Sequence, residues 1–358
     1  MQQSPVAHFL SNLNEVEYYQ TNIQQYSVCI ELAQQINIHT ESTISGDIDE
    51  LTESLNSVNG ALVWFVIKLY ELSKNESKIQ KKCEVFIHFL LENDVNGYAL
   101  IRILGQYSFL KNRNSLFAQK EVLPYLFSSH EKMKLQSWRG YLQNKNLEYA
   151  EFREIHKEFF NILNYALGQN DKELIESLTD LYVYSIYFEY HGDSIVSLRK
   201  LQRLENNIVA EQVLETIRII IVKHSDDLDK IWSWFGEYLQ DRIYQVNQVL
   251  SQKEVSKIWY LLTDHPQLIV KLEKIILNLP FKEEWTGFLH DISRNHVEII
   301  LGNESIWCRV LAYYLNQQDD RITGLCYEEE QVLFIRLLEF DDKNLLKLSL
   351  FSKGIVIH

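Results

Sequence analysis

Histidine and aspartate are the side chains of this sequence whose spacing comes nearest to that of a reactive centre. His290 and Asp291 are adjacent, and His296 follows within the same predicted helix. Such a group is typical of a metal-dependent hydrolase, in which the ligands hold an ion that activates water. That chemistry needs further ligands from other helices, whereas a polar helix face near Asn295 accounts for these residues without an ion. The polar face is favoured, and a helical metal-dependent hydrolase is kept as the second alternative function.

A serine-containing segment is the other candidate for catalysis. Gly192-Asp193-Ser194-Ile195 resembles the nucleophile block of a lipase-like hydrolase. That family places its serine after a strand of an α/β sheet, but here the block follows a tyrosine-rich helix. Gly192, Asp193 and Ser194 fit a C-cap glycine followed by an N-cap pair, and we favour this structural interpretation.

Other chemistries lack the residues that they require. There is no Cys-x-x-Cys or His-x-x-x-His pair for zinc and no Glu-x-x-His for a di-iron helical bundle. The phosphate-binding Gly-x-x-x-x-Gly-Lys loop, Gly-x-Gly-x-x-Gly and the Gly-x-Ser-x-Gly serine motif are absent too. We therefore expect no catalytic residues, no metal, no cofactor and no enzymatic activity.

Carboxylates, in contrast, are abundant and clustered. The chain has 49 Asp and Glu residues against 35 Lys and Arg, a formal net charge of −14. Carboxylates at helix N-termini are stabilised by the helix dipole, by about 0.3–1 kcal/mol each, but this effect does not explain the uncompensated total. Such a charge steers cationic partners. The candidate partner-binding carboxylates are Asp47, Asp49, Glu50, Asp226, Asp227, Asp229, Glu328, Glu329 and Glu330.

Two aromatic residues could act with these carboxylates. Trp234 and Tyr244 lie off the apolar stripe of the helix predicted over 226–250. Each is either buried against a second layer of helices or exposed as an anchor for a partner, since interfaces combine rigid aromatic anchors with steering charges. Both residues are included among the candidate partner-binding residues.

The elements that position these residues are predicted to be helices. Only 12 glycines and 4 prolines interrupt 358 residues, which favours long helices with short connections. Three segments fit the capping box of a helix start, beginning at Ser73, Ser128 and Ser251. Helices are predicted over 5–19, 22–37, 47–57, 59–73, 75–93, 95–110, 114–127, 129–143, 147–168, 171–190, 194–205, 208–224, 226–250, 252–263, 266–278, 281–301, 304–317 and 328–340.

The fold class indicated by this pattern is all-α. Hairpins recur roughly every 35 to 45 residues in the second half, a spacing typical of helical repeats. We expect an irregular α-solenoid of HEAT-like hairpins or a large multi-helix bundle, with one possible short strand at 354–357. The predicted division is an N-terminal helical half, 1–145, and a C-terminal array, 146–358, although one continuous domain is also compatible with the sequence.

The same bulk properties limit the partners. The longest apolar run, Ala61–Ile67, has seven residues and cannot span a membrane. The acidic balance disfavours nucleic acid and anionic lipid. The sparse cysteines and the polar start of the chain, which is unlike a signal peptide, predict a cytoplasmic protein.

These observations predict a binding protein. The main hypothesis is a non-enzymatic acidic helical protein that binds a basic protein partner, most concretely a bacterial immunity or antitoxin-type inhibitor that acts by occlusion. The alternative is a helical-repeat scaffold or adaptor that binds a peptide or helix of a regulatory partner. The oligomeric state is left open.

Overall fold

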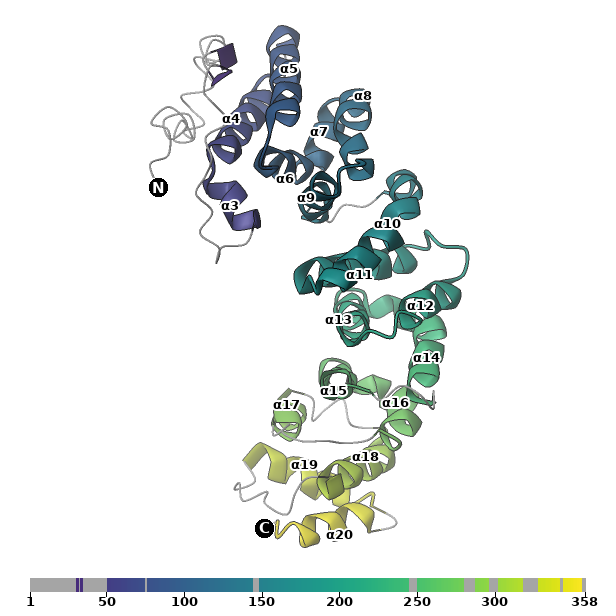
Figure 1. The fold of residues 1–358 in the computed structure, drawn as a ribbon. Helices are drawn as coiled ribbons and strands as arrows, with labels where there is room; N and C mark the ends of the chain where they lie inside the picture. Colours follow the sequence, from purple (N-terminus) through teal and green to yellow (C-terminus); the bar gives the residue numbers. More distant parts are fainter. Residues whose placement is uncertain are drawn as a thin grey trace. The chain divides into compact units, whose positions relative to one another are not determined.

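The computed structural model describes residues 30–31, 33–34, 50–74, 76–143, 148–244, 250–279, 287–295, 302–317, 328–341 and 344–355. Within these ranges every regular element is a helix (Figure 1), which confirms the all-α prediction. Contacts divide the chain into two compact units, Met1–Asn170 and Asp171–His358. The predicted boundary after residue 145 falls outside the described residues and stays a prediction.

The first unit contains helices of varied length. Its α-helices are α3 Glu50–Asn56, α4 Val58–Leu72, α5 Ser77–Asn93, α6 Tyr98–Leu104, α7 Tyr107–Arg113, α8 Ser115–Phe117, α9 Glu131–Leu142 and α10 Tyr149–Gln169. A π-helical turn over Ala118–Val122 and a 3₁₀ helix over Leu123–Phe127 connect α8 to α9. Helix α6 lies at the centre, because it contacts α3, α4, α5 and α9.

The second unit is a succession of helical hairpins. Its α-helices are α11 Lys172–Tyr187, α12 Ser194–Gln202, α13 Asn207–Lys223, α14 Leu228–Tyr244, α15 Gln252–Asp264, α16 Ile269–Ile276, α17 Gly287–Asn295, α18 Glu304–Gln317, α19 Glu328–Leu338 and α20 Leu345–Ser352. Two short 3₁₀ helices, Ser225–Asp227 and Pro266–Leu268, precede α14 and α16.

Helices of successive hairpins pack against each other in two layers. One layer runs through α11, α13, α15, α17 and α19, and the other through α12, α14, α16, α18 and α20. Figure 1 shows the hairpins stacked one after another from α11 to α20. Ion pairs connect neighbouring members of a layer, joining Arg199 to Asp241, Lys257 to Glu215 and Arg309 to Glu273. Each hairpin therefore buries its apolar faces against the next hairpin, as in helical-repeat proteins.

Local capping explains several helix boundaries. Asn206 begins α13 by accepting hydrogen bonds from the amides of Ile208 and Val209. The predicted capping box at Ser251 is confirmed, since Glu254 N donates to Ser251 Oγ and Ser251 N donates to Glu254. The boxes predicted at Ser73 and Ser128 are wrong, because α5 and α9 begin at later residues without a side-chain cap.

Three predicted segments differ from the structure. The helix predicted over 95–110 is two helices, because α6 ends at Leu104 and α7 begins at Tyr107. Residues 345–352 form α20, where no helix was predicted. Gly354 lies in a turn after α20 with a φ of 69°, and neither Gly354 nor Ile355 is part of a strand. Val356 and Ile357, the other two residues of the predicted strand, lie outside the described residues.

Candidate functional site

Three of the predicted carboxylates lie together at the junction of α13 and α14. Asp226 and Asp227 belong to the 3₁₀ turn between the two helices, and Asp229 lies in the first turn of α14. Asp226 is exposed and has no hydrogen bond or ion pair to any described residue. The side chain of Asp229 is 91% exposed and pairs with Lys271 at 2.7 Å. Two of the three carboxylates are therefore presented to solvent.

A stack of aromatic rings lies beside these carboxylates, at the C-terminal end of α11. Phe188 is at the centre of the stack, with ring centroids 5.2 Å from Tyr187, 5.8 Å from Tyr190 and 6.3 Å from Tyr184. The rings of Tyr184 and Tyr190 lie nearly parallel to that of Phe188, at 23° and 30°. Phe188 is nevertheless 47% exposed. The ring is thus held in place while much of its surface is open.

Tyr187 connects the ring stack to the acidic turn. Its hydroxyl group donates a 2.7 Å hydrogen bond to Asp227 Oδ2, and its ring lies 4.9 Å from that of His224. Burial, together with the hydrogen bond to Asp227, raises the pKa of Tyr187 to about 12. Asp227 therefore fixes the turn against α11 and differs in this respect from Asp226 and Asp229.

Glu189 adds a carboxylate at the same edge. It follows α11 with a φ of 60°, in the left-handed region that glycine and asparagine adopt more easily. Its carboxylate pairs with Lys230 at 2.7 Å, and the ammonium group of Lys230 lies 5.5 Å from the centre of the Tyr187 ring. The four carboxylates of this region outnumber the two ammonium groups, those of Lys230 and Lys271, that pair with them.

We call this surface the acidic–aromatic edge. It consists of Tyr184, Phe188, Glu189, Tyr190, Asp226 and Asp229, with Tyr187 and Asp227 beneath them. Its residues come from the end of α11, the loop that follows it, and the α13–α14 turn. This geometry offers exposed aromatic surface at a turn that carries carboxylates.

The two predicted aromatic anchors are not part of this edge. Trp234 is only 7% exposed, because α14 packs against both α12 and α16. The structure therefore corrects its inclusion as an exposed anchor and supports the alternative that Trp234 is buried. Tyr244 is 58% exposed, but it ends α14, about 24 Å along the helix from the acidic turn.

The remaining predicted carboxylates are dispersed. Glu50 pairs with Arg139 inside the first unit, and Asp47 and Asp49 lie outside the described residues. In α19, Glu330 is only 9% exposed, whereas the side chains of Glu328 and Glu329 lie outside the description. Among the described carboxylates that were predicted, those of the α13–α14 turn are joined to the aromatic stack, through the hydrogen bond from Tyr187 to Asp227.

The sequence did not identify Phe188 and Glu189 as site residues. A helix was predicted over 171–190 with almost no polar face, which indicated burial on all sides. The α-helix ends instead at Tyr187, with Phe188 as C-cap, so the last rings leave the packed layer. The sequence pattern predicted neither the end of α11 at Tyr187 nor the left-handed backbone conformation of Glu189.

The candidate reactive segments have structural roles. Asp193 caps α12 by accepting a hydrogen bond from Val196 N at 3.0 Å, as predicted, and Ser194 begins the helix. Gly192 is not the C-cap of α11, since Phe188 has that position. Ser185 Oγ lies 2.8 Å from His191 Nε2, but Ser185 is fully buried and its hydroxyl group cannot reach a substrate.

The predicted metal group is only partly described. His290 and Asp291 lie on α17, and His296 lies outside the described residues. Within the part of the chain that is described, no three histidine, cysteine, aspartate or glutamate side chains are placed to hold a metal ion.

Comparisons with known proteins give no match. The chain matches no protein family, no curated protein and no solved structure. Among the described helices, none combines the length and the apolar character needed to cross a bilayer. The site must therefore be interpreted from its own geometry.

Proposed function

We propose that this protein is a non-enzymatic binding protein that takes a basic protein partner at the acidic–aromatic edge. The observation that carries the proposal is the position of Phe188, a half-exposed ring that packs on Tyr187, whose hydroxyl group binds Asp227 in the turn that presents Asp226 and Asp229 to solvent. A few well-packed residues, often aromatic, supply most of the binding energy at protein interfaces, and complementary charges raise the association rate.

The acidic–aromatic edge is suited to this role because few of its side chains would have to become ordered when a partner binds. Tyr184 and Tyr190 already pack against the Phe188 ring in nearly parallel orientation. The Tyr187–Asp227 hydrogen bond fixes the acidic turn relative to α11. A partner that covers Phe188 therefore gains apolar contact without the usual loss of side-chain freedom. Lysine or arginine residues of the partner would face Asp226, which has no other described partner.

Within this proposal, an immunity or antitoxin-type inhibitor acting in the cytoplasm is the most specific hypothesis. The net charge of −14 supports it, since an inhibitor must capture a cationic toxin quickly. Inhibition would follow from occlusion, because the edge would cover the basic residues with which the toxin binds its own substrate.

A helical-repeat adaptor is the second candidate, and the stacked hairpins of the second unit favour it. An adaptor binds through the surface that successive hairpins form and does not require a basic partner. The salt dependence of association distinguishes the two candidates, because only the first requires strong charge steering.

Phe188→Ala is expected to weaken binding of the native partner by about thirtyfold, the effect of losing an interface hot spot of roughly 2 kcal/mol. The double variant Asp226→Asn/Asp229→Asn should reduce the association rate several-fold and flatten its dependence on salt, with a smaller change in the dissociation rate. Asp227 is left intact because it holds Tyr187. The measurement is surface plasmon resonance with the partner that co-purifies from native cells, at several salt concentrations.

The matched control changes the same number of charges away from the edge. Glu131 and Glu154 are exposed and lie in the first unit, so Glu131→Gln/Glu154→Gln alters the net charge equally. If this control slows association as much as the edge variant does, the net charge acts without a specific site. Unchanged binding by both Phe188→Ala and the edge variant would exclude the edge as the interface.

A further inference from the structure

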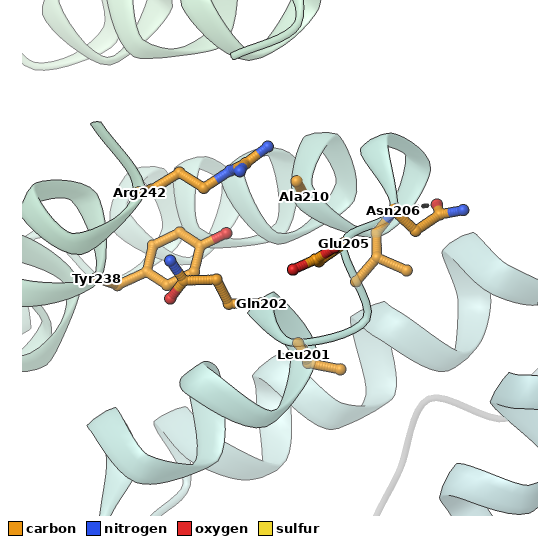
Figure 2. A pocket seen from close by; sticks show the side chains of 8 residues that line it. Leu201, Gln202, Glu205, Asn206, Ala210, Tyr238 and Arg242 are labelled. Atoms are coloured by element: carbon orange, nitrogen blue, oxygen red, sulfur yellow. Dashed lines mark hydrogen bonds between the residues drawn. The ribbon is translucent and has the colours of Figure 1, made fainter. Parts of the chain in front are cut away.

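A small cavity lies between the end of α12, the start of α13 and the second half of α14 (Figure 2). Its volume is about 10 Å³, measured as the space open to the centre of a water-sized molecule, which is room for about one group of that size. It is at the ends of α13 and α14 opposite to the acidic–aromatic edge, so a ligand bound in it is independent of the proposed function. Polar or charged side chains reach the cavity from Gln202, Glu205, Tyr238 and Arg242, among others.

Gln202 is the unusual residue of this cavity. It is 9% exposed, and neither its amide oxygen nor its amide nitrogen has a hydrogen-bond partner among the described residues. Buried side-chain amides are normally paired, because an unsatisfied buried donor or acceptor loses its hydration without compensation. Figure 2 shows the Gln202 amide extending beside the ring of Tyr238. The cavity is thus lined by a buried polar group whose hydrogen-bonding capacity is unused among the described residues.

The charges around the cavity favour a cation. Arg242 contributes a guanidinium group, but Glu254, which is fully buried, neutralises it through bonds of 2.8 and 3.0 Å. Glu205 is exposed and thus lies at the mouth of the cavity, and in Figure 2 its carboxylate points toward the same space as the Tyr238 hydroxyl group. The cavity therefore has one carboxylate in excess.

Glu205 is held in this position by an uncommon backbone conformation. Its φ of 49° is in the left-handed region, after the last turn of α12. A side chain with a Cβ atom is disfavoured there relative to glycine. Glu205 lines the same cavity as Gln202. A turn with this backbone conformation would by itself favour glycine or asparagine, so the presence of a glutamate is consistent with a role in a binding site.

We propose that this cavity binds a primary alkylammonium group, such as that of a lysine side chain, with Gln202 Oε1 and the Glu205 carboxylate as acceptors. An ammonium group has the size of a water molecule and donates three hydrogen bonds, which fits the volume and the acceptors present. The planar guanidinium group of arginine is too large for the space. An anion is disfavoured because Glu205 is the unneutralised charge among the lining residues, the guanidinium group of Arg242 being paired with Glu254.

The test is a titration of the full-length ¹⁵N-labelled chain, followed through the side-chain amide signals of Gln202. The Gln202→Met variant, which keeps the side-chain length, assigns these signals by their loss. The probes are methylammonium and the peptide acetyl-Gly-Lys-Gly-amide, with the Arg and Nε-acetyl-Lys versions of the peptide as controls, all at constant ionic strength. Methylammonium and the Lys peptide are expected to shift the Gln202 signals saturably, and the two control peptides are not.

Substitutions then test the two acceptors separately, with binding followed through the backbone amide signals of Asn206 and Ala210, which line the cavity and are present in every variant. Gln202→Met and Glu205→Gln are each expected to weaken binding about tenfold, whereas Glu173→Gln, an exposed carboxylate on α11, leaves it unchanged. Glu205→Gly removes the carboxylate and relieves the backbone, so it should weaken binding while the thermal midpoint stays or rises. This variant separates loss of the site from loss of the fold.

The titration results either support or overturn the ammonium site. Tighter binding of the Lys peptide than of methylammonium identifies lysine of a protein as the source, and equal binding identifies a free amine; both support an ammonium site. No saturable shift with either probe means that the cavity holds only water and overturns the proposal. Equal binding of the Arg peptide, or undiminished binding by Gln202→Met, overturns it as well.

Discussion

Replacement of Arg242 by methionine is expected to lower the free energy of unfolding of the second unit by about 3–5 kcal/mol. Arg242 lies near the end of α14 and Glu254 in the first turn of α15, with side chains that are 5% and 0% exposed. Their two hydrogen bonds, of 2.8 and 3.0 Å, join the helices across the loop between them. Loss of the guanidinium group leaves the Glu254 carboxylate buried without its cation, and an unpaired buried charge is far more costly than a missing pair.

A second variant separates the unpaired charge from the loss of packing. Arg242→Met/Glu254→Gln leaves no buried charge and should recover more than half of the loss. Lys253→Met is the matched surface control: Lys253 is 71% exposed and lies 3.9 Å from Glu211, so its removal should cost less than about 1 kcal/mol. Urea unfolding followed by circular dichroism measures all three variants. A loss for Arg242→Met that equals that of Lys253→Met would contradict a buried pair.

The sequence predicts the role of one residue of this ion pair but not of the other. Glu254 is the third residue after Ser251, and this spacing alone predicts a capping box, which the structure confirms. Nothing in the pattern around Arg242 indicates burial, because arginine on an amphipathic helix is normally solvated. The burial of Arg242 depends on how α14 packs against α15, and this packing is determined by the stacking of successive hairpins.

The same distinction applies to the acidic–aromatic edge. The cluster of Asp226, Asp227 and Asp229 was apparent from the sequence, because carboxylates that are neighbours in the sequence remain neighbours in a turn. Phe188 is distant from it in sequence, and the two meet because α11 and α13 lie side by side in one layer. Local periodicity also placed Trp234 off the apolar stripe, where it could be buried or exposed. It is buried in the structure, where α14 packs against α12 and α16 of its own layer. Residues are thus predictable where one helix determines their surroundings and unpredictable where two or more helices do.

Gly140→Ala is expected to destabilise the first unit by about 3 kcal/mol, although alanine is the better helix former. Gly140 lies in α9, where it faces the backbone of α6. A Cβ atom at this position would be 2.3 Å from the carbonyl oxygen and 2.9 Å from the Cα atom of Ile101. Backbone atoms cannot rotate away as a side chain can, so the two helices would have to separate, and overpacking of this kind costs about 1–3 kcal/mol or more. The gain in helix propensity, about 1 kcal/mol, does not offset a clash this severe.

Gly168→Ala is the matched control, because it makes the same chemical change in another helix of the same unit. Gly168 lies in the last turn of α10, is exposed, and a Cβ atom there would meet nothing within 4 Å. Only the propensity term remains, so this variant should stabilise the unit by about 0.5–1 kcal/mol. The two glycines cannot be told apart from sequence, since both lie in predicted helices, and opposite signs in thermal unfolding are therefore a direct measure of the α6–α9 contact. If Gly140→Ala also stabilised the protein, the backbones of α6 and α9 could not approach as closely as described.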